Sequence, residues 1–234
     1  PIPKFPVLFY KPVTSITGPT DDIPVPPIAQ EGEGLDYECE LVVVIGKEAR
    51  DVPESQALNY VLGYAVGNDV SHRDWQLKRG GGQWSLGKGF DGWAPFGPGI
   101  VTPSLIPDPN ALKISTKLNG QTVQSSTTKD MIFSVAKTIS FLSQGTTLLP
   151  GDVIFTGRKS IHFTGMELMP DCCMLLLYQI RVTDTASRPQ GVGMGRKPQL
   201  WLKDGDKVEV SLEGVGSCLN QVVFSKPSAQ PSKL

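Results

Sequence analysis

The sequence lacks an excess of charge, a long apolar run and an ordered cysteine pattern, and each absence excludes a class of protein. The net charge of the 234 residues is -1, so the composition does not favour binding to nucleic acid or to an anionic membrane. No apolar run is long enough to span a bilayer. The four cysteines show neither zinc-finger spacing nor a disulfide framework, which favours a reducing compartment.

The stretch from Asp36 to Gly46 carries the strongest functional signal. It begins with acidic residues and continues as an apolar, β-branched run closed by glycine, which predicts a buried strand. Alternate side chains of a strand share a face, so Glu38 and Glu40 point the same way, with Asp36 one step further back. Neighbouring carboxylates repel, and a hard cation removes that cost because it prefers carboxylate oxygen. The alternative is an acidic strand end that faces solvent.

A third acidic residue follows the next strand-like run, residues 59–66. Asp69 would lie at the exit of that strand, which makes it a candidate third ligand beside Glu38 and Glu40. Cys39 lies between the two glutamates and points to the opposite face. We expect it to be a buried, small apolar residue.

Several ordered motifs resemble those of the fumarylacetoacetate hydrolase family. After the Glu-x-Glu strand come Asn-Asp-Val-Ser-x-Arg-Asp at 68–74, Gln-Trp at 83–84 and Gly-Lys-Gly-Phe-Asp at 87–91. The similarity continues through Ala-Pro-Phe-Gly-Pro at 94–98, Leu-Asn-Gly at 118–120, Leu-Pro-Gly-Asp-Val-Ile-Phe-Thr-Gly at 149–157 and Glu-Gly-Val-Gly at 213–216. The resemblance implies a β-rich α+β fold, a mixed β-roll or sandwich with peripheral helices, and a homodimer.

The resemblance also implies a reaction class, chemistry on 2-oxo or 1,3-dioxo acids. A divalent cation, Mg²⁺ or alternatively Mn²⁺ or Ca²⁺, would hold the substrate carboxylate and the adjacent keto oxygen as a Lewis acid, with Glu38, Glu40 and Asp69 as its ligands. The polarised carbonyl stabilises an enolate, through which C–C hydrolysis, decarboxylation and keto–enol isomerisation all pass. The sequence does not choose between these three reactions.

Other positions match residues that contact substrate in the family. Lys88 matches a substrate-binding lysine and is the predicted catalytic residue, because it can pair with a carboxylate or enolate oxygen. Gln76 matches a substrate-contacting glutamine. Arg73 is expected to be structural and paired with a nearby acid. Residues 188–193 match the loop that approaches substrate in the family, and this predicted substrate loop would supply three further contacts: Arg188, Pro189 and Gly191.

Residues 158–187 do not fit the family pattern, because removing them joins Gly157 directly to the substrate loop. This insert has three competing interpretations: a lid, a disordered loop, or translated intron sequence from a faulty gene model. A long insertion without turn signals argues against a designed part of a compact domain and favours the third interpretation. The predicted organisation is one domain over residues 1–224, which includes this insert, followed by a disordered tail over residues 225–234.

Histidine is scarce, and its scarcity bears on the mechanism. In the family, a segment N-terminal to the first residues of this sequence often carries a histidine and an acid that activate water. Residues 1–37 of this sequence contain no histidine. The N-terminus of this sequence is therefore expected to be truncated relative to the family. We expect His72 to be structural, and His162 lies in the insert. The competing prediction is a catalytically impaired metal-binding or dimerising remnant of the family.

The chain ends in Ser232, Lys233 and Leu234, the tripeptide that the peroxisomal import receptor reads. The Ser/Pro-rich residues before it would keep this end accessible. The sequence therefore predicts a peroxisomal location with that receptor as a partner, and the cytoplasm is the alternative.

Turn signals and hydrophobic periodicity predict the other elements. Residues 112–118 alternate as a half-buried strand, and Asn119-Gly120 predicts a type I′ hairpin turn. Residues 129–143 have the apolar spacing of an amphipathic helix. Residues 95–109 are expected to form loop and edge structure.

Overall fold

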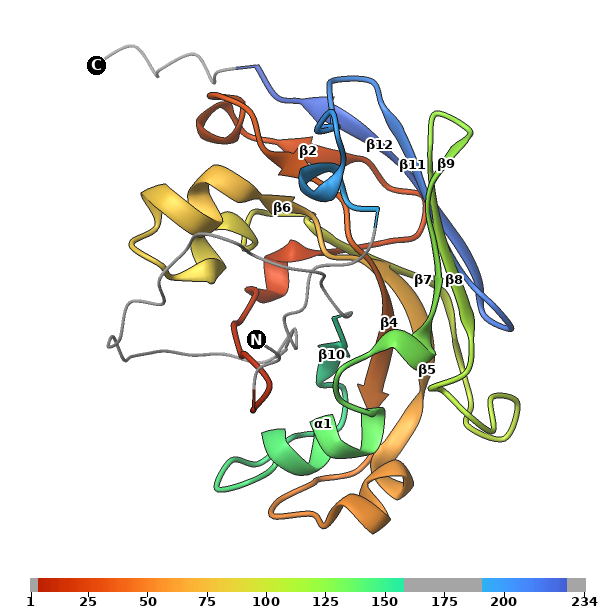
Figure 1. Cartoon of the computed structure of the whole chain (residues 1–234). Coiled ribbons are helices and arrows are strands. Elements are labelled where there is room, and N and C mark those ends of the chain that lie inside the picture. The colour runs from red at the N-terminus through yellow and green to blue at the C-terminus, as the bar shows by residue number, and fades with distance from the viewer. Residues whose placement is uncertain (1–3, 158–190, 227–234) are drawn as a thin grey trace, which may run out of the picture.

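Two five-stranded sheets form the framework of this computed structural model, which describes residues 4–157 and 191–226 (Figure 1). The first sheet, in the order β1-β7-β5-β4-β10, consists of β1 (Ile16–Thr17), β7 (Ala94–Val101), β5 (Val61–Asn68), β4 (Cys39–Ile45) and β10 (Val153–Phe155). The second, in the order β2-β12-β11-β8-β9, consists of β2 (Ile23–Val25), β12 (Gly216–Phe224), β11 (Lys207–Leu212), β8 (Lys113–Leu118) and β9 (Gln121–Thr127). Both sheets mix parallel and antiparallel pairs, so the predicted β-rich, mixed-sheet fold is confirmed.

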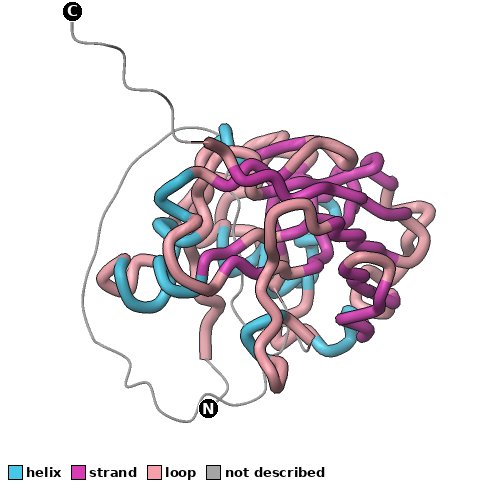
Figure 2. The backbone as a smooth tube through the Cα atoms, turned by 90° about the horizontal axis from the view of Figure 1, so that it is seen from above, coloured by secondary structure: helices cyan, strands magenta, loops and turns pink. Residues whose placement is uncertain are grey.

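Helical structure is peripheral and mostly short. Figure 2 shows most of the helical turns on one side of the strands. They are η1 (Val13–Ser15), η2 (Pro27–Ala29), η3 (Glu54–Tyr60), η4 (Trp75–Arg79), η5 (Trp84–Gly87), η6 (Thr128–Asp130), α1 (Val135–Leu142) and η7 (Gly193–Gly195). A short antiparallel pair, β3 (Leu35–Asp36) with β6 (Ser71–His72), completes the described secondary structure.

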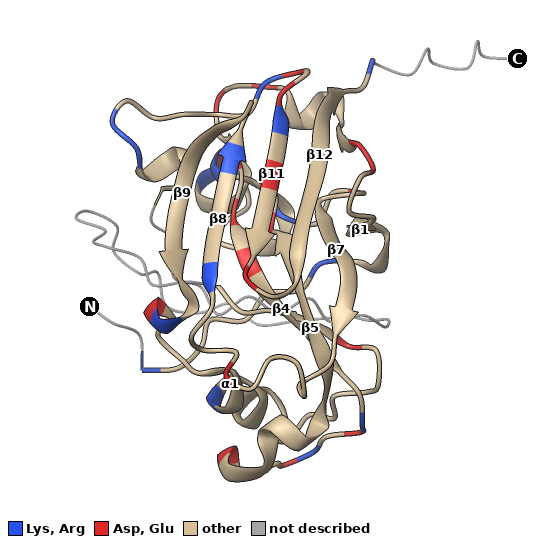
Figure 3. Cartoon of the chain, turned by 90° about the vertical axis from the view of Figure 1, so that its right-hand side faces the viewer, with Lys and Arg blue, Asp and Glu red and all other residues tan. Residues whose placement is uncertain are grey.

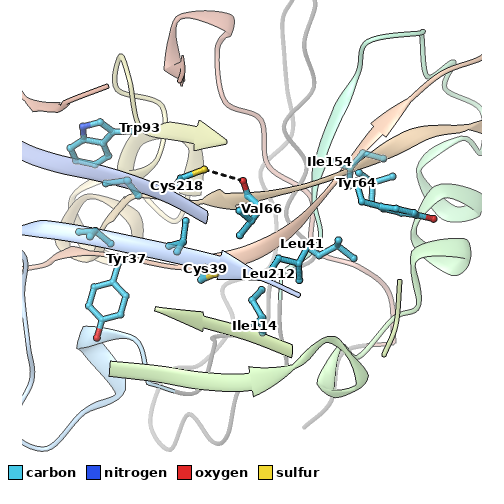
Figure 4. Packing of buried hydrophobic residues seen from close by; sticks show 14 of the residues in the cluster. Tyr37, Cys39, Leu41, Tyr64, Val66, Trp93, Ile114, Ile154, Leu212 and Cys218 are labelled. Atoms are coloured by element: carbon cyan, nitrogen blue, oxygen red, sulfur yellow. Dashed lines mark hydrogen bonds between the residues drawn. The ribbon is translucent and has the colours of Figure 1, made fainter. Parts of the chain in front are cut away.

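The main hydrophobic core lies between the two sheets. On β4, Cys39 and Leu41 point into this core, where they approach Ile114 and Leu212 of the second sheet (Figure 4). Cys39 is fully buried, with its Sγ 3.8 Å from the carbonyl oxygen of Ser211, so the prediction of a small buried residue there is confirmed.

The opposite face of the first sheet carries a second, smaller hydrophobic cluster, made by Val42, Ala65, Ala94, Val153 and Phe155. Because side chains alternate along a strand, the face of β4 that presents Val42 also presents Glu40. This alternation separates the acidic side chains from the main core.

The predicted strand from residue 36 to residue 46 is interrupted at its start. β3 ends at Asp36 and β4 begins at Cys39. The backbone N–H of Tyr37 donates to Asp36 Oδ1 at 2.9 Å, and that of Glu38 donates to Asn68 Oδ1 at 2.9 Å. Because side chains accept these hydrogen bonds, the two residues leave the regular ladder.

The predicted helix over residues 129–143 is shorter than expected. Ser134 ends the preceding irregular segment, and its Oγ accepts the N–H of Lys137 at 3.1 Å, so α1 starts at Val135 and ends at Leu142.

The hairpin prediction is confirmed. Asn119 and Gly120 have φ angles of 49° and 80°, the positive values that a type I′ turn requires.

The expectation of loop and edge structure over residues 95–109 is wrong for its first part. Ala94–Val101 forms β7, which lies between β1 and β5. The β5–β7 register shifts between Tyr64 and Val66, which pair with Val101 and Gly97. The intervening residues, including Pro98, are therefore spared regular pairing, so proline without an N–H is tolerated inside a sheet.

The outer face of the second sheet is charged and solvent-facing. Figure 3 shows Lys and Arg together with Asp and Glu on β8 and β11. Lys117 and Glu209 form a cross-strand ion pair there, with Nζ and Oε2 3.1 Å apart. Within the part of the chain that the structure describes, no helix has the length and hydropathy to cross a membrane.

Candidate metal centre

Three buried carboxylates meet where β4 begins and β5 ends. Glu38 precedes β4, Glu40 lies within it and Asp69 follows β5, and each is at most 3% exposed. One oxygen of each carboxylate lies within 4.8 Å of the others. The N–H of Asp69 donates to the carbonyl oxygen of Glu38 at 2.9 Å, which fixes the two chain segments against each other. The structure thus brings together the three residues that the sequence predicted as ligands.

Glu40 is the least satisfied of the three. Its Oε2 accepts the N–H of Gly157 at 3.1 Å, while its Oε1 has no hydrogen-bond donor among the described residues. Burial raises the pKa of Glu40 well above its usual range, and the carboxylates of Asp69 and Glu38 raise it further. A buried carboxylate oxygen without a donor is unfavourable, and a hard cation would satisfy it. The all-oxygen donor set therefore fits Mg²⁺, Mn²⁺ or Ca²⁺.

Lys88 lies inside this acidic cluster. It is 1% exposed, and its Nζ donates to Glu38 Oε2 at 2.8 Å, to Ser71 Oγ at 2.6 Å and to Asp69 Oδ2. The ring of Phe9 lies over the ammonium group, with its centroid 4.9 Å from Nζ. The structure places Lys88 beside the predicted ligands, and its pairing with a substrate oxygen stays a prediction.

Arg73 neutralises the other side of the cluster. Its Nε lies 2.9 Å from Asp36 Oδ2, and its Nη2 lies 2.5 Å from Glu38 Oε1, so the predicted structural pairing is confirmed. Burial alone would lower the pKa of Arg73, but Glu38 and Asp36 outweigh burial and raise it. Its Nη1 donates to Gln76 Oε1 at 2.9 Å. That hydrogen bond fixes the Gln76 amide oxygen on Arg73. The amide Nε2 therefore points away from Arg73 and can donate to another acceptor.

The described part of the predicted substrate loop is tied to the same region. The carbonyl oxygen of Gly191 accepts a hydrogen bond from the Tyr37 hydroxyl at 2.8 Å. The N–H groups of Gly193 and Met194 donate to the two carboxylate oxygens of Asp36, at 2.7 Å and 3.1 Å. The loop is therefore held beside the residue pair that precedes Glu38.

Several predictions concern positions outside the described residues: Arg188, Pro189, His162, the insert at 158–187 and the tail beyond residue 226. His72 is described and is 1% exposed, and its Nδ1 accepts the N–H of Trp75 at 3.4 Å. Burial lowers the pKa of His72. His72 is not a member of the carboxylate group.

Lys11 is a further buried cation of this region that no sequence motif predicted. Its Nζ lies 2.7 Å from Asp69 Oδ1 and donates to the carbonyl oxygens of Val70, Lys88 and Trp93 at 3.1, 2.6 and 2.7 Å. Burial alone would raise the pKa of Asp69, but the ammonium groups of Lys11 and Lys88 outweigh burial and hold it below the usual range. Main-chain carbonyls have no residue-type signature, so no motif in the sequence indicates this contact.

Buried charge in this region is nearly balanced. Four buried carboxylates (Asp36, Glu38, Glu40 and Asp69) face three buried cationic side chains (Lys11, Arg73 and Lys88). Of these four carboxylates, Glu40 is the one without an ion-pair partner among the described residues. The carboxylate that lacks a cationic partner is therefore the same one, Glu40, whose Oε1 lacks a hydrogen-bond donor.

Comparison with known proteins extends these observations. A sequence model described as fumarylacetoacetate (FAA) hydrolase C-terminal matches residues 1–223. The human protein named oxaloacetate tautomerase FAHD2A, mitochondrial, is 40% identical over 223 residues, which cover 95% of this chain and 60% of that protein. The chain spans 60% to 65% of the length of the first curated relatives it matches.

Solved structures agree with the sequence comparison. The X-ray structure of 5-carboxymethyl-2-hydroxymuconate delta-isomerase from Mycobacterium smegmatis has a TM-score of 0.74 at 36% identity, covering 96% of this chain and 72% of that one. Fumarylpyruvate hydrolase from Pseudomonas aeruginosa, in complex with Mn²⁺ and pyruvate, has a TM-score of 0.69 at 31% identity, covering 93% of this chain and 78% of that one. The relatives are thus a tautomerase, an isomerase and a hydrolase.

The prediction of a peroxisomal location is wrong. The relatives named as oxaloacetate tautomerases in human, cattle, rat and Xenopus are mitochondrial. A three-residue ending carries too little information to outweigh relatives that match almost the whole chain. The import receptor is withdrawn as a partner for the same reason, whereas the homodimer stays a prediction.

Proposed function

This chain belongs to the fumarylacetoacetate hydrolase family, and from that premise we propose that it binds one divalent cation through Glu38, Glu40 and Asp69 and catalyses enol chemistry on a small 2-oxo acid. Keto–enol tautomerisation of oxaloacetate is the reaction to test first, because a relative 40% identical carries that name. The observation that carries the proposal is the buried group of three carboxylates in which one oxygen of Glu40 has no donor.

The three carboxylates would hold the cation, with Mg²⁺ and Mn²⁺ as the first candidates. When bound, the cation supplies Lewis-acid polarisation of the substrate's keto oxygen and neutralises carboxylate charge. A fumarylpyruvate hydrolase of similar fold, solved with Mn²⁺ and pyruvate, supports this choice of cation and of substrate class. The remaining steps depend on the chain's own side chains.

Lys88 is the proposed catalytic residue. Its ammonium group lies 2.8 Å from Glu38 Oε2, so an oxygen of a substrate that docks against these carboxylates comes within reach of a fixed donor. When a proton leaves the carbon beside the keto group, negative charge develops on the keto oxygen. A hydrogen bond from Lys88 Nζ, formed in exchange for one of its contacts with Glu38, Asp69 or Ser71, stabilises that charge in a site from which water is largely excluded.

Gln76 and the loop at Gly191 are proposed to orient the substrate. Arg73 fixes the amide oxygen of Gln76, so the amide nitrogen is available to donate to a substrate carboxylate. Gly191 would contribute a substrate contact from the loop beside Asp36, and the contacts predicted for Arg188 and Pro189 fall outside the described residues. The contacts of Gly191 and Gly193 with Tyr37 and Asp36 support that placement.

A second candidate function is metal binding without efficient catalysis. The observation that favours it is that the group of candidate ligands contains carboxylates alone, while the buried His72 ring already accepts a backbone N–H. A positioned general acid or base is worth about 10²–10⁴-fold in rate. Without one, this chain would bind the cation and turn over slowly.

The test follows the ultraviolet absorbance of enol-oxaloacetate as it converts to the keto form, with Mn²⁺ and after chelation by EDTA. We expect an Mn²⁺-dependent rate that Glu40→Gln lowers by more than about tenfold, because even outer-shell changes cost about 10–100-fold at metal sites. Glu209→Gln is the matched control, a strand glutamate that pairs with Lys117 on the outer face of the second sheet. Calorimetric Mn²⁺ binding without any rate enhancement would favour the second candidate, and absence of both would refute the proposal.

A further inference from the structure

We propose that Lys11 is a positioning residue that holds the Asp69 carboxylate and the main chain at Lys88 in one arrangement for cation binding. The inference rests on the proposed function, since it assigns a role toward the same cation. Lys11 is not a candidate ligand, because its charge is positive and its side chain offers no lone pair while protonated.

The contacts of Lys11 immobilise its ammonium group. The residue is 2% exposed, and its Nζ is surrounded by the carbonyl oxygens of Val70, Lys88 and Trp93, at 2.6 to 3.1 Å, and by Asp69 Oδ1 at 2.7 Å. An ammonium group has three protons, and four acceptors surround this one. These contacts fix the ammonium group in one position, unlike that of a mobile surface lysine, and we call this group with its four acceptors the Lys11 junction.

The junction determines which oxygen of Asp69 faces the cluster. Lys11 engages Oδ1, so Oδ2 is the oxygen that pairs with Lys88, whose ammonium group also pairs with Glu38. The terminal torsion of an aspartate is broad and two-fold, so an unrestrained carboxylate would rotate between several orientations. A fixed Oδ2 lowers the entropic cost of forming a ligand bond.

The same ammonium group also joins segments that are distant in sequence. Val70 lies two residues after β5, Lys88 is the residue after η5, and Trp93 precedes β7. Because Lys11 donates to all three carbonyls, the main chain that carries Lys88 is tied to the main chain that carries Asp69. A candidate ligand and the candidate catalytic residue thus share one support.

Two roles of Lys11 make opposite predictions about cation affinity. A positive charge 2.7 Å from Oδ1 of a ligand carboxylate repels a divalent cation bound to that carboxylate, so removing a purely electrostatic Lys11 would tighten cation binding. Removing a positioning Lys11 would weaken cation binding although the site becomes more negative. The sign of the change in affinity therefore separates the two roles.

The experiment measures the Mn²⁺ dissociation constant of Lys11→Met by calorimetry and the electron paramagnetic resonance spectrum of the bound Mn²⁺. Methionine keeps the length of the side chain and removes both the charge and the donors. We expect binding at least about tenfold weaker, in the range that outer-shell changes produce at metal sites, and a changed line shape of the bound ion. Unchanged or tighter binding would overturn the proposal.

Asn220→Ala is the matched control. Asn220 is also buried, and its Nδ2 also donates to main-chain carbonyls, those of Gly18 and Asp21 at 3.0 and 2.8 Å, but neither of these hydrogen bonds involves a residue of the carboxylate cluster. We expect its Mn²⁺ affinity and spectrum to match the wild type. An equal loss of affinity in this variant would show that general destabilisation explains the effect, and would overturn the role of Lys11.

A double-mutant cycle with Asp69→Asn tests whether Lys11 acts through Asp69. We expect Lys11→Met to weaken binding no further in the Asp69→Asn background, whereas independent, additive losses would contradict the proposal. If Lys11→Met does not fold, as judged by near-ultraviolet circular dichroism, Lys11→Gln takes its place, because a glutamine amide retains two donors without charge. A wild-type chain that binds no Mn²⁺ would instead refute the metal centre of the proposed function.

Discussion

Single side chains decide how the negative charge of the centre is compensated. Arg73 faces Asp36 and Glu38 from a position that is 4% exposed, and both carboxylates are buried as well. Removing one partner of a buried ion pair leaves an uncompensated charge, which is more damaging than losing the attraction itself.

Arg73→Met should therefore lower the free energy of unfolding by about 3–5 kcal/mol, measured by urea denaturation. The control is Arg79→Met, because Arg79 pairs with Asp74 and Glu31 at the solvent-exposed surface, where such pairs contribute little. Equal losses in the two variants would contradict the account of Arg73.

The carboxylates of the centre could be predicted from the sequence. Of the cationic side chains that pair with them, Arg73 could be predicted and Lys11 could not. Alternation along a strand is a local rule, and it correctly placed Glu38 and Glu40 on one face. Arg73 could be expected to pair with an acid. The burial of Lys11 depends on carbonyl groups contributed by residues 70, 88 and 93, and the positions of carbonyl groups follow from the tertiary fold rather than from residue type.

Among the strands, the pairing of β4 with β5 does most to shape the centre. Glu40 lies opposite Gly67 in this pairing, and a side chain on Gly67 would collide with the Phe155 ring and with Val42. The absence of a side chain at residue 67 leaves room for the Phe155 ring against Gly67, the residue opposite Glu40. The glycine is therefore a packing requirement of the site-bearing face.

Gly67→Ala should lower the free energy of unfolding by about 1–3 kcal/mol, the usual range for overpacking, and should weaken Mn²⁺ binding because the shift reaches Glu40. Gly99→Ala is the control, a strand glycine of β7 whose added methyl group would meet no atom within 4 Å. Thermal melts and calorimetry on both variants test this directly. A Gly67→Ala protein as stable as Gly99→Ala would contradict the packing argument.

Elements with strong local signals were predicted well, and those fixed by distant partners were not. Asn119-Gly120 carries its turn preference in two residues, so the hairpin of β8 and β9 could be foreseen. The start of β4 at Cys39 depends on Asn68, which accepts the N–H of Glu38. β7 contains prolines and glycines that disfavour a strand, and it is one because two neighbouring strands pair with it.

At the scale of the whole molecule, the main hydrophobic cluster joins residues from Ile23 to Val222 and draws on strands of both five-stranded sheets. We infer that they unfold as one cooperative unit to which the cation centre is coupled. Because a ligand that binds only the folded state stabilises it, Mn²⁺ at 100 times its dissociation constant should add about 2.7 kcal/mol.

Scanning calorimetry should therefore show a single transition whose midpoint rises with Mn²⁺ in the wild type. In Glu40→Gln the midpoint should not respond to the same Mn²⁺ concentration, while Glu209→Gln should behave like the wild type. Two separate transitions would contradict the single unit, and an equal rise in all three proteins would place the Mn²⁺ effect elsewhere on the molecule.

The most direct measurement is a crystal structure of the wild-type chain grown with Mn²⁺, with anomalous diffraction recorded to locate the ion. We expect one strong anomalous peak bonded to carboxylate oxygens of Glu38, Glu40 and Asp69, at roughly 2.1–2.2 Å, close to the distances of octahedral oxygen sites. A peak bonded to other residues, or no peak at a Mn²⁺ concentration that supports turnover, would contradict it.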